Sequence, residues 1–435
     1  LSRNPMQLAI LLSLILTQGS ALPDKRTNLY DDYVDMFFSR ESAKSAAVRR
    51  HIVLLKDLHR FLGWTLHANA ETSRTKSSGR MSADELRATL NEYLLAEGHP
   101  TEIVEEIFGA MLERVVMIVP RIQGTYEFEV QPLREYFAAR FLYDTASYSP
   151  TGKEKKGTKP DRFDAVARNF YWLNVVRFLA GCFSKGELLD LADRVKALIQ
   201  DSLVGKTRHP IVLTAMLLSD WVFEQSPKAV SQLVDLLSSP DNMQLMLAPS
   251  RYGRHDVTTL PAQSGGRKVF ETAFALLESP TTHSDRLRAF ATVAQAQFPA
   301  EVCEARWMES AACTSNPSRW LEIGRYLSSL YNVDIDLLRD KLSKTSLNRA
   351  MATVLVRACR SDCALSSEHN VQLLFNVLLS EPRFVIRRPA AAPHIDRSAE
   401  TGRLSRRAGR NESGNADHAV VAGDRPEWTK RAASG

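Results

Sequence analysis

The apolar residues of this chain follow a helical period almost everywhere, and that period changes once, at residues 115–130. The stretch VVMIVPRIQGTYEFEV is rich in β-branched and aromatic residues, and QGT at 123–125 supplies a turn. This pattern predicts a β-hairpin. The next segment, QPLREYFAARFL at 131–142, returns to a helix, because Leu133, Phe137 and Phe141 repeat every four residues on one face. The fold must therefore place one hairpin among many helices.

The segments before the hairpin predict helices at 27–38, at 42–70 and in two further places. Ser82 and Glu85 have the spacing of a capping box and open a helix that runs to Leu95. Gly98 ends that helix, and Pro100 begins another that runs to about residue 114. Helix, helix and hairpin in this order are the plan of a winged-helix domain.

The segments after the hairpin begin with residues 147–162, whose Gly, Pro and Lys content is typical of a linker. Beyond it the sequence predicts helices at 163–181, 184–201, 208–224, 227–238, 267–279, 283–296, 317–329, 345–359 and 365–380, with a long loop at 248–267. Antiparallel helix pairs of this size indicate an irregular α-solenoid. The predicted fold class is therefore mainly α: a winged-helix domain with one β-hairpin, followed by an irregular α-solenoid of HEAT-like helical repeats.

The two ends of the chain differ from the middle. Residues 383–435 have hardly any periodic apolar face and cannot bury enough surface to offset their chain entropy, which predicts a disordered tail; a basic tail that binds acidic partners is the alternative. At the other end, Arg3 precedes an apolar run, and small residues follow it, as in a signal peptide. The run is too short for a membrane span, which needs about 20 residues. Pro5 suits the first turn of a helix that is apolar nearly all round, so we interpret this segment as a buried helix.

Charge and cysteine content disfavour a nucleic-acid-binding protein and a disulfide-stabilised one. Lys and Arg number 56 and Asp and Glu number 50, a net charge of +6; from Arg383 onward there are 11 basic and 6 acidic residues, so residues 1–382 carry 45 basic against 44 acidic side chains. A near-neutral body does not favour nucleic acid as a partner. The five scattered cysteines suit reduced thiols in the cytoplasm better than a disulfide framework.

A search for catalytic and metal-binding motifs finds none that is complete. VGKT at 204–207 ends like a phosphate-binding loop, but Gln200 stands where that loop requires glycine. His51, His59 and His67 are eight residues apart, a spacing that drifts around a helix, so we interpret them as partly buried or surface histidines rather than ligands. Aromatic and arginine residues at 168–178 could stack on bases, but their two-sided apolar pattern favours packing.

Three segments, in this order, resemble the carboxyl-terminal part of a NACHT module, from the STAND class of signal-transducing NTPases. They are LSRNPMQLAILLSLI at 1–15, LPDKRTNLYDDYVDMFF at 22–38 and YEFEVQPLREYFAARFL at 126–142. In that family a P-loop domain precedes a small helical domain, a winged helix and helical repeats that act as a sensor. The resemblance implies a small helical domain at 1–70, a winged helix at 71–146, a linker at 147–162 and a helical-repeat sensor at 163–382.

The resemblance also implies site residues. The family places a proline against the adenine of bound nucleotide, and a winged-helix motif F-x-H-x-x-x-x-E-Y-F-A-A holds a histidine that touches the phosphates. The matching positions here are Pro5 for the proline and Phe128, Val130, Glu135, Tyr136 and Phe137 for the motif. Because Val130 replaces the histidine, the resemblance implies that the phosphate contact is absent.

The nucleotide machinery itself is missing from the 435 residues, which contain no Walker A lysine, no acidic magnesium ligand on a strand and no αβ pattern. We therefore expect no enzyme activity and no cofactor in this chain. The resemblance implies ATP or ADP with Mg²⁺ for the full-length family, bound by a nucleotide-binding domain amino-terminal to this chain. It implies a cytoplasmic, truncated regulatory and sensor portion of a signalling switch in bacterial antiphage defence, with a protein trigger and a homo-oligomer on activation.

Two other functions stay open. A winged-helix regulator that binds nucleic acid would place Arg87, Arg114 or Arg121 near phosphates. A plain α-solenoid scaffold makes no prediction about nucleotides.

Overall fold

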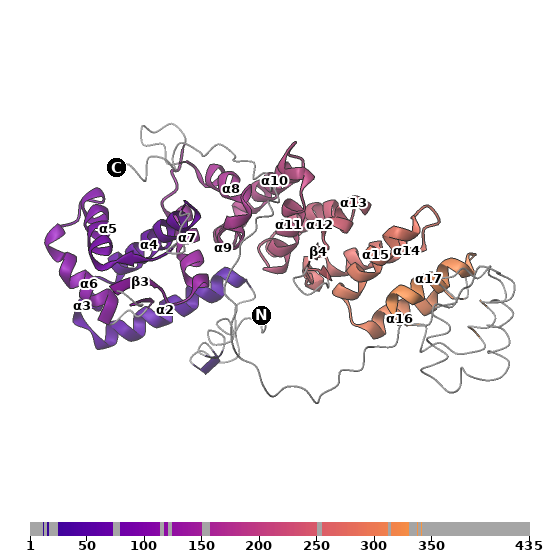
Figure 1. Ribbon diagram of the computed structural model, residues 1–435, viewed down its shortest axis with the longest axis horizontal. Coiled ribbons are helices and arrows are strands. Elements are labelled where there is room, and N and C mark those ends of the chain that lie inside the picture. The colour runs from indigo at the N-terminus through magenta and orange to yellow at the C-terminus, as the bar shows by residue number, and fades with distance from the viewer. Residues whose placement is uncertain are drawn as a thin grey trace, which may run out of the picture. The chain divides into compact units, whose positions relative to one another are not determined.

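The structure is a computed structural model that describes residues 25–72, 79–113, 117–120, 124–149, 157–249, 255–311 and 315–329, with helical residues at 12, 15, 16, 337 and 341. The chain divides into two compact units, Leu1–Ser329 and Leu330–Gly435. The description below concerns the first. Its described residues are mainly helical, as the sequence predicts (Figure 1). Pro5, the helices predicted at 345–359 and 365–380 and the tail predicted at 383–435 lie outside the described residues.

The first half of this unit contains α2 (Arg26–Lys44), α3 (Ala46–Arg50), α4 (Ile52–Thr72), β1 (Met81–Ser82), α5 (Ala83–Ala96), α6 (Val104–Glu113), β2 (Ile118–Pro120), β3 (Thr125–Phe128) and α7 (Gln131–Asp144). The second half contains α8 (Lys159–Ala167), α9 (Leu173–Cys182), α10 (Leu188–Ile199), α11 (His209–Ser219), α12 (Pro227–Leu237), α13 (Pro240–Leu245), β4 (Ala248–Pro249), β5 (His255–Asp256), α14 (Gly266–Glu278), α15 (Ser284–Gln297), α16 (Ala300–Glu309) and α17 (Pro317–Leu327). None of these described helices is both long enough and apolar enough to cross a bilayer.

The predicted hairpin is confirmed. β2 and β3 pair antiparallel, with Ile118 opposite Phe128. The apolar pattern did not predict β1, which has only two residues and pairs with the other edge of β3, Met81 opposite Tyr126. The sheet order is therefore β1-β3-β2, and α5 and α6 lie between β1 and β2 in the chain.

Local capping explains where many helices begin. The capping box predicted for α5 is present: the Glu85 amide donates to the Ser82 hydroxyl at 3.2 Å, and the Ser82 amide donates to the Glu85 carboxylate at 2.7 Å. Thr158 and Asp161 form a second capping box, so α8 begins inside the segment predicted to be a linker. Proline occupies the first turn of α7, α8, α11, α12, α13 and α17, where its missing N–H costs nothing.

Two predicted helices are interrupted. The helix predicted at 163–181 is instead α8, a short 3-10 turn at Phe170–Trp172, and α9, because the side chain of Asn169 accepts a hydrogen bond from the amide of Tyr171 and caps a new start. The helix predicted at 42–70 ends and restarts twice, near Ser45 and His51. The predicted loop at 248–267 contains the paired strands β4 and β5.

The core of the first half lies where α4 packs along α7 (Figure 1). Gly63 of α4 makes this approach possible. A Cβ atom at Gly63 would lie 2.6 Å from the Cβ of Phe137 and 2.9 Å from the backbone nitrogen of Ala138. α7 also contacts α9, and α9 contacts α2. α7 is therefore the helix on which the surrounding elements converge.

The second half is built from helices that pack on the next helix in the chain or on the one after it, such as α14 on α15, α10 on α12 and α15 on α17. The contact between α16 and α17 shows how specific this packing is. The indoles of Trp307 and Trp320 stack at 4.1 Å, and each donates to the backbone carbonyl of the other, at 2.9 and 3.2 Å. Both indole N–H groups are therefore satisfied inside an apolar contact.

Candidate functional site

The motif residues at the start of α7 are brought together, and most of them are buried. Phe128 ends β3, and Glu135, Tyr136 and Phe137 follow on α7; all four side chains are less than 5% exposed. Val130 stands between them at the N-cap of α7 in an extended conformation, and its side chain caps nothing. The motif is therefore part of the interior, apart from the half-buried Val130.

The two aromatic residues that the motif places on α7 face different helices. Phe137 lies 5.5 Å, centroid to centroid, from the ring of His59 on α4 and 5.6 Å from Phe128. Tyr136 lies 5.7 Å from Tyr30 on α2 and 5.7 Å from Phe178 on α9. One turn of α7 thus joins the sheet, α4, α2 and α9 through ring contacts.

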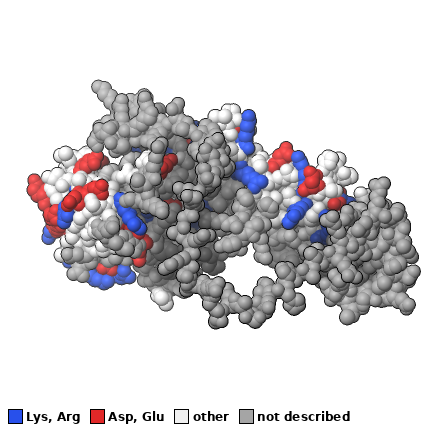
Figure 2. Space-filling view, in the orientation of Figure 1, with Lys and Arg blue, Asp and Glu red and all other residues white. Residues whose placement is uncertain are grey.

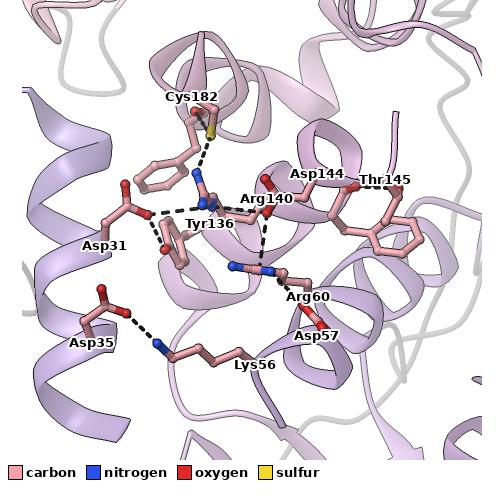
Figure 3. Close-up of polar contacts among 12 residues, drawn as sticks. Asp31, Asp35, Lys56, Asp57, Arg60, Tyr136, Arg140, Asp144, Thr145 and Cys182 are labelled. Atoms are coloured by element: carbon pink, nitrogen blue, oxygen red, sulfur yellow. Dashed lines mark hydrogen bonds and ion pairs between the residues drawn. The ribbon is translucent and has the colours of Figure 1, made fainter. Parts of the chain in front are cut away.

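Polar contacts reinforce the same junction (Figure 3). The Tyr136 hydroxyl donates to the Asp31 carboxylate of α2 at 2.6 Å. Arg140 lies one turn further along α7, with Nε 3.7 Å from Asp31 and 3.5 Å from Asp144. Its guanidinium also donates to the sulfur of Cys182 on α9 at 3.7 Å. Tyr136 and Arg140 therefore hold α2 and α9 from the same face of α7.

The protonation states at this junction point to structure rather than catalysis. Burial raises the pKa of Tyr136 well above its usual value, and the Asp31 carboxylate adds to that shift. Burial also raises the pKa of the Cys182 thiol to about 12. Tyr136 consequently stays a hydrogen-bond donor at neutral pH, and Cys182 stays a thiol, which is a poor nucleophile.

Replacing Tyr136 with Phe tests the polar part of the junction. The substitution keeps the ring contacts but removes the donor to Asp31, and hydrogen bonds to charged groups contribute about 1.5–3 kcal/mol. We expect the free energy of unfolding in urea to fall by about 1.5 kcal/mol. Tyr148→Phe is the matched control, because Tyr148 is fully exposed. Equal stability of Y136F and Y148F would show that the Asp31 contact contributes nothing.

The prediction that the three helical histidines are partly buried or surface residues is wrong for two of them. His59 and His67 are fully buried, and only His51 is half-buried. The ring of His67 contacts the rings of both Tyr171 and Trp172, with centroids 4.7 and 4.6 Å away. Burial lowers the pKa of His59 to about 4 and that of His67 to about 3, so both are neutral at pH 7.

Within the described ranges, no group of acidic, His or Cys side chains could hold a metal ion.

The segment VGKT at 204–207 forms a short 3-10 turn, and the backbone amides at its start already donate hydrogen bonds. The Asp201 carboxylate accepts from the amide of Leu203 at 2.9 Å and from that of Val204 at 3.0 Å. Amides that cap a carboxylate of their own chain are not free to wrap a phosphate. The incomplete motif therefore has no phosphate cradle in this conformation.

The aromatic segment at 168–178 is split between interior and surface. Trp172 is buried and donates to Glu71 at 2.9 Å, as expected for packing, whereas Phe170 is 68% exposed. The two arginines of the segment form ion pairs, Arg168 with Asp201 at 2.7 Å and Arg177 with Asp220 at 2.6 Å. Neither arginine is therefore unpaired.

Sequence reasoning missed the charged residues of the junction. Asp31, Arg140 and Cys182 lie up to about 150 residues apart and form no local motif. The one available signal was a polar residue on an apolar helix face, as Arg140 is one turn after Tyr136. That signal does not identify the partner helix.

Comparison with known proteins adds nothing to these observations. No protein-family model matches this sequence, and no curated protein or solved structure matches it either.

Proposed function

We propose that this chain is the regulatory and sensor portion of a NACHT-type STAND switch, in which a winged helix sits between a small helical domain and helical repeats. The observation that supports this most is the sheet order β1-β3-β2, with α4 before β1 and with α5 and α6 between β1 and β2. This order of helices and strands fits the winged helix that we propose. The helix pairs from α8 to α17 fit an irregular, HEAT-like solenoid.

The burial of the motif residues gives this proposal a mechanism. Glu135 contacts α9, Tyr136 contacts α2 and Phe137 contacts α4, so a displacement of α7 would disturb all of those contacts at once. In the proposed switch, a protein trigger binds the repeats and biases two arrangements of the junction. A nucleotide-binding domain amino-terminal to this chain reads the outcome through α2. The biological setting that we propose is cytoplasmic signalling in antiphage defence.

The charge of α6 argues against the nucleic-acid alternative. α6 directly precedes the hairpin and is the second helix of the proposed winged helix after β1, which is the position of a recognition helix. It exposes Glu105 and Glu106. Figure 2 shows acidic side chains over the α5–α6 region. Arg87 lies over the ring of Phe108 at 4.0 Å and donates to Glu105 at 3.0 Å. Arg114 and Arg121 lie outside the described residues. An acidic recognition helix would repel phosphates.

The test of the proposal is ATP turnover by the purified chain. We expect no magnesium-dependent hydrolysis, because phosphoryl transfer needs a lysine, a metal ligand and a cradle of amides that this sequence lacks. The assay should include a P-loop NTPase as a positive control. Sustained hydrolysis that depends on Mg²⁺ and survives further purification would refute the non-catalytic role.

A further inference from the structure

Four charged residues lie together where α2, α7, α9 and α11 meet. Arg177 of α9 donates two hydrogen bonds to the carboxylate of Asp220, at 2.6 and 2.8 Å. Arg26 of α2 is 7% exposed, and its guanidinium lies 3.7 Å from the same carboxylate and 4.2 Å from the ring centre of Phe178. Two arginines thus share one carboxylate in a largely buried place. An uncompensated buried charge is strongly unfavourable.

The second negative charge is the motif residue Glu135, which is 3% exposed. Its carboxylate accepts from the amide groups of Gln131 at 2.8 Å and Asn174 at 3.4 Å, and Asn174 in turn accepts from Arg177 at 3.3 Å. Burial lowers the pKa of Arg26, as does Arg177, whereas Asp220 and Glu135 act in the opposite direction. The four charges therefore balance only when Glu135 is included. We call Arg26, Glu135, Arg177 and Asp220 the charge quartet.

Backbone contacts place the quartet at the ends of two helices. The amide of Arg26 donates to the carbonyl of Asp220 at 3.4 Å, and the Thr27 hydroxyl donates to the carbonyl of Phe178 at 3.2 Å. Asp220 is the C-cap of α11 and precedes Trp221, which has a positive φ of 61°. A non-glycine residue in this region of backbone conformation is strained and persists only where its surroundings hold it. The end of α11 is therefore held in place in part by its contacts with α2 and α9.

We propose that the charge quartet couples the carboxyl end of α11 to the amino-terminal turns of α2 and α7. When Asp220 moves away with α11, two arginines remain against one glutamate, and the turns that carry Arg26 and Glu135 loosen together. The motif glutamate Glu135 is then a positioning residue, the counter-charge of the quartet. This coupling deepens the proposed function and rests on it for its biological cause, because a trigger bound to the repeats would be what moves α11.

Hydrogen exchange on the full chain, resolved to short peptides, tests the coupling. We expect Asp220→Asn to raise the opening equilibrium constant at least tenfold both at residues 27–30 and at residues 133–137. Glu135→Gln should raise it at residues 27–30 and at 220–223. The double variant should open more than the product of the two single effects, since it leaves two buried arginines with no carboxylate, whereas each single variant leaves them one.

Asp164→Asn is the matched control, because Asp164 forms a 2.8 Å ion pair with Arg194 that is much more exposed. It should leave exchange at all three segments unchanged. If D220N does not fold, Arg26→Met replaces the buried charge with an apolar side chain and leaves the pair of Arg177 with Asp220 in place, and it should still raise exchange at residues 133–137. Effects confined to the substituted helix, or effects that multiply in the double variant, would overturn the coupling. ATP turnover by the wild-type chain would refute the proposed function while leaving this result unaffected.

Discussion

Gly63→Ala should lower the free energy of unfolding by about 2–3 kcal/mol, although alanine is the better helix former. A methyl group at Gly63 would meet the Cβ of Phe137 at 2.6 Å and two backbone atoms of α7, the Ala138 nitrogen at 2.9 Å and the Arg134 oxygen at 3.0 Å. Backbone atoms of a packed helix cannot rotate away as a flexible side chain can. α4 and α7 must separate, and the ring contacts of the motif weaken with them.

The matched control is Gly109→Ala on α6. A Cβ atom at Gly109 would have no neighbour within 4 Å, so only the helix propensity changes. We expect a gain of about 0.5–1 kcal/mol. Urea unfolding followed by circular dichroism measures both variants. If G63A were as stable as G109A, the close packing of α4 on α7 could not be a source of stability.

Local patterns accounted for most elements because their causes are local. The capping box at Ser82 and the strand pattern of the hairpin operate within a few residues, and the capping box and the paired strands both appear in the structure as expected. The misses have local causes too, but weaker ones. Asn169 splits a predicted helix with one side-chain hydrogen bond, and β1 has only two residues, which is too short to show an alternating pattern.

The candidate site was only half predictable. A family likeness singled out Glu135, Tyr136 and Phe137 but gave no partner for any of them in this chain. The partners Asp31 and Asn174 come from α2 and α9, and the separations in sequence reach about 100 residues. Side chains meet across such distances because helices pack, and packing depends on the whole core rather than on a motif. Whether a charge is exposed or buried therefore had to come from the structure.

The two fully buried histidines should make the protein sensitive to mild acid. The pKa of His59 is lowered to about 4 and that of His67 to about 3, while an unfolded histidine has a pKa of about 6.5. The unfolded chain then binds protons that the folded chain does not bind. The contribution of the two neutral histidines to the free energy of unfolding is fully present above pH 6.5. It falls as the pH drops below that value, and it stops falling below the folded pKa of each residue. At pH 5 the loss is about 2 kcal/mol for each histidine.

His67→Phe should remove about half of this acid sensitivity. Phenylalanine keeps an aromatic ring against Tyr171 and Trp172 and takes no proton, so the dependence on His67 disappears whatever the variant does to stability at pH 7. The measurement is the difference between the free energies of unfolding at pH 7 and pH 5, which we expect to shrink by about 2 kcal/mol. His99→Gln is the control, because His99 is exposed in the turn after α5 and should leave that difference unchanged. If H67F kept the pH dependence of the wild type, His67 could not contribute to it. His67 would then bind its proton in the folded protein as readily as in the unfolded chain, with its contacts to Tyr171 and Trp172 intact.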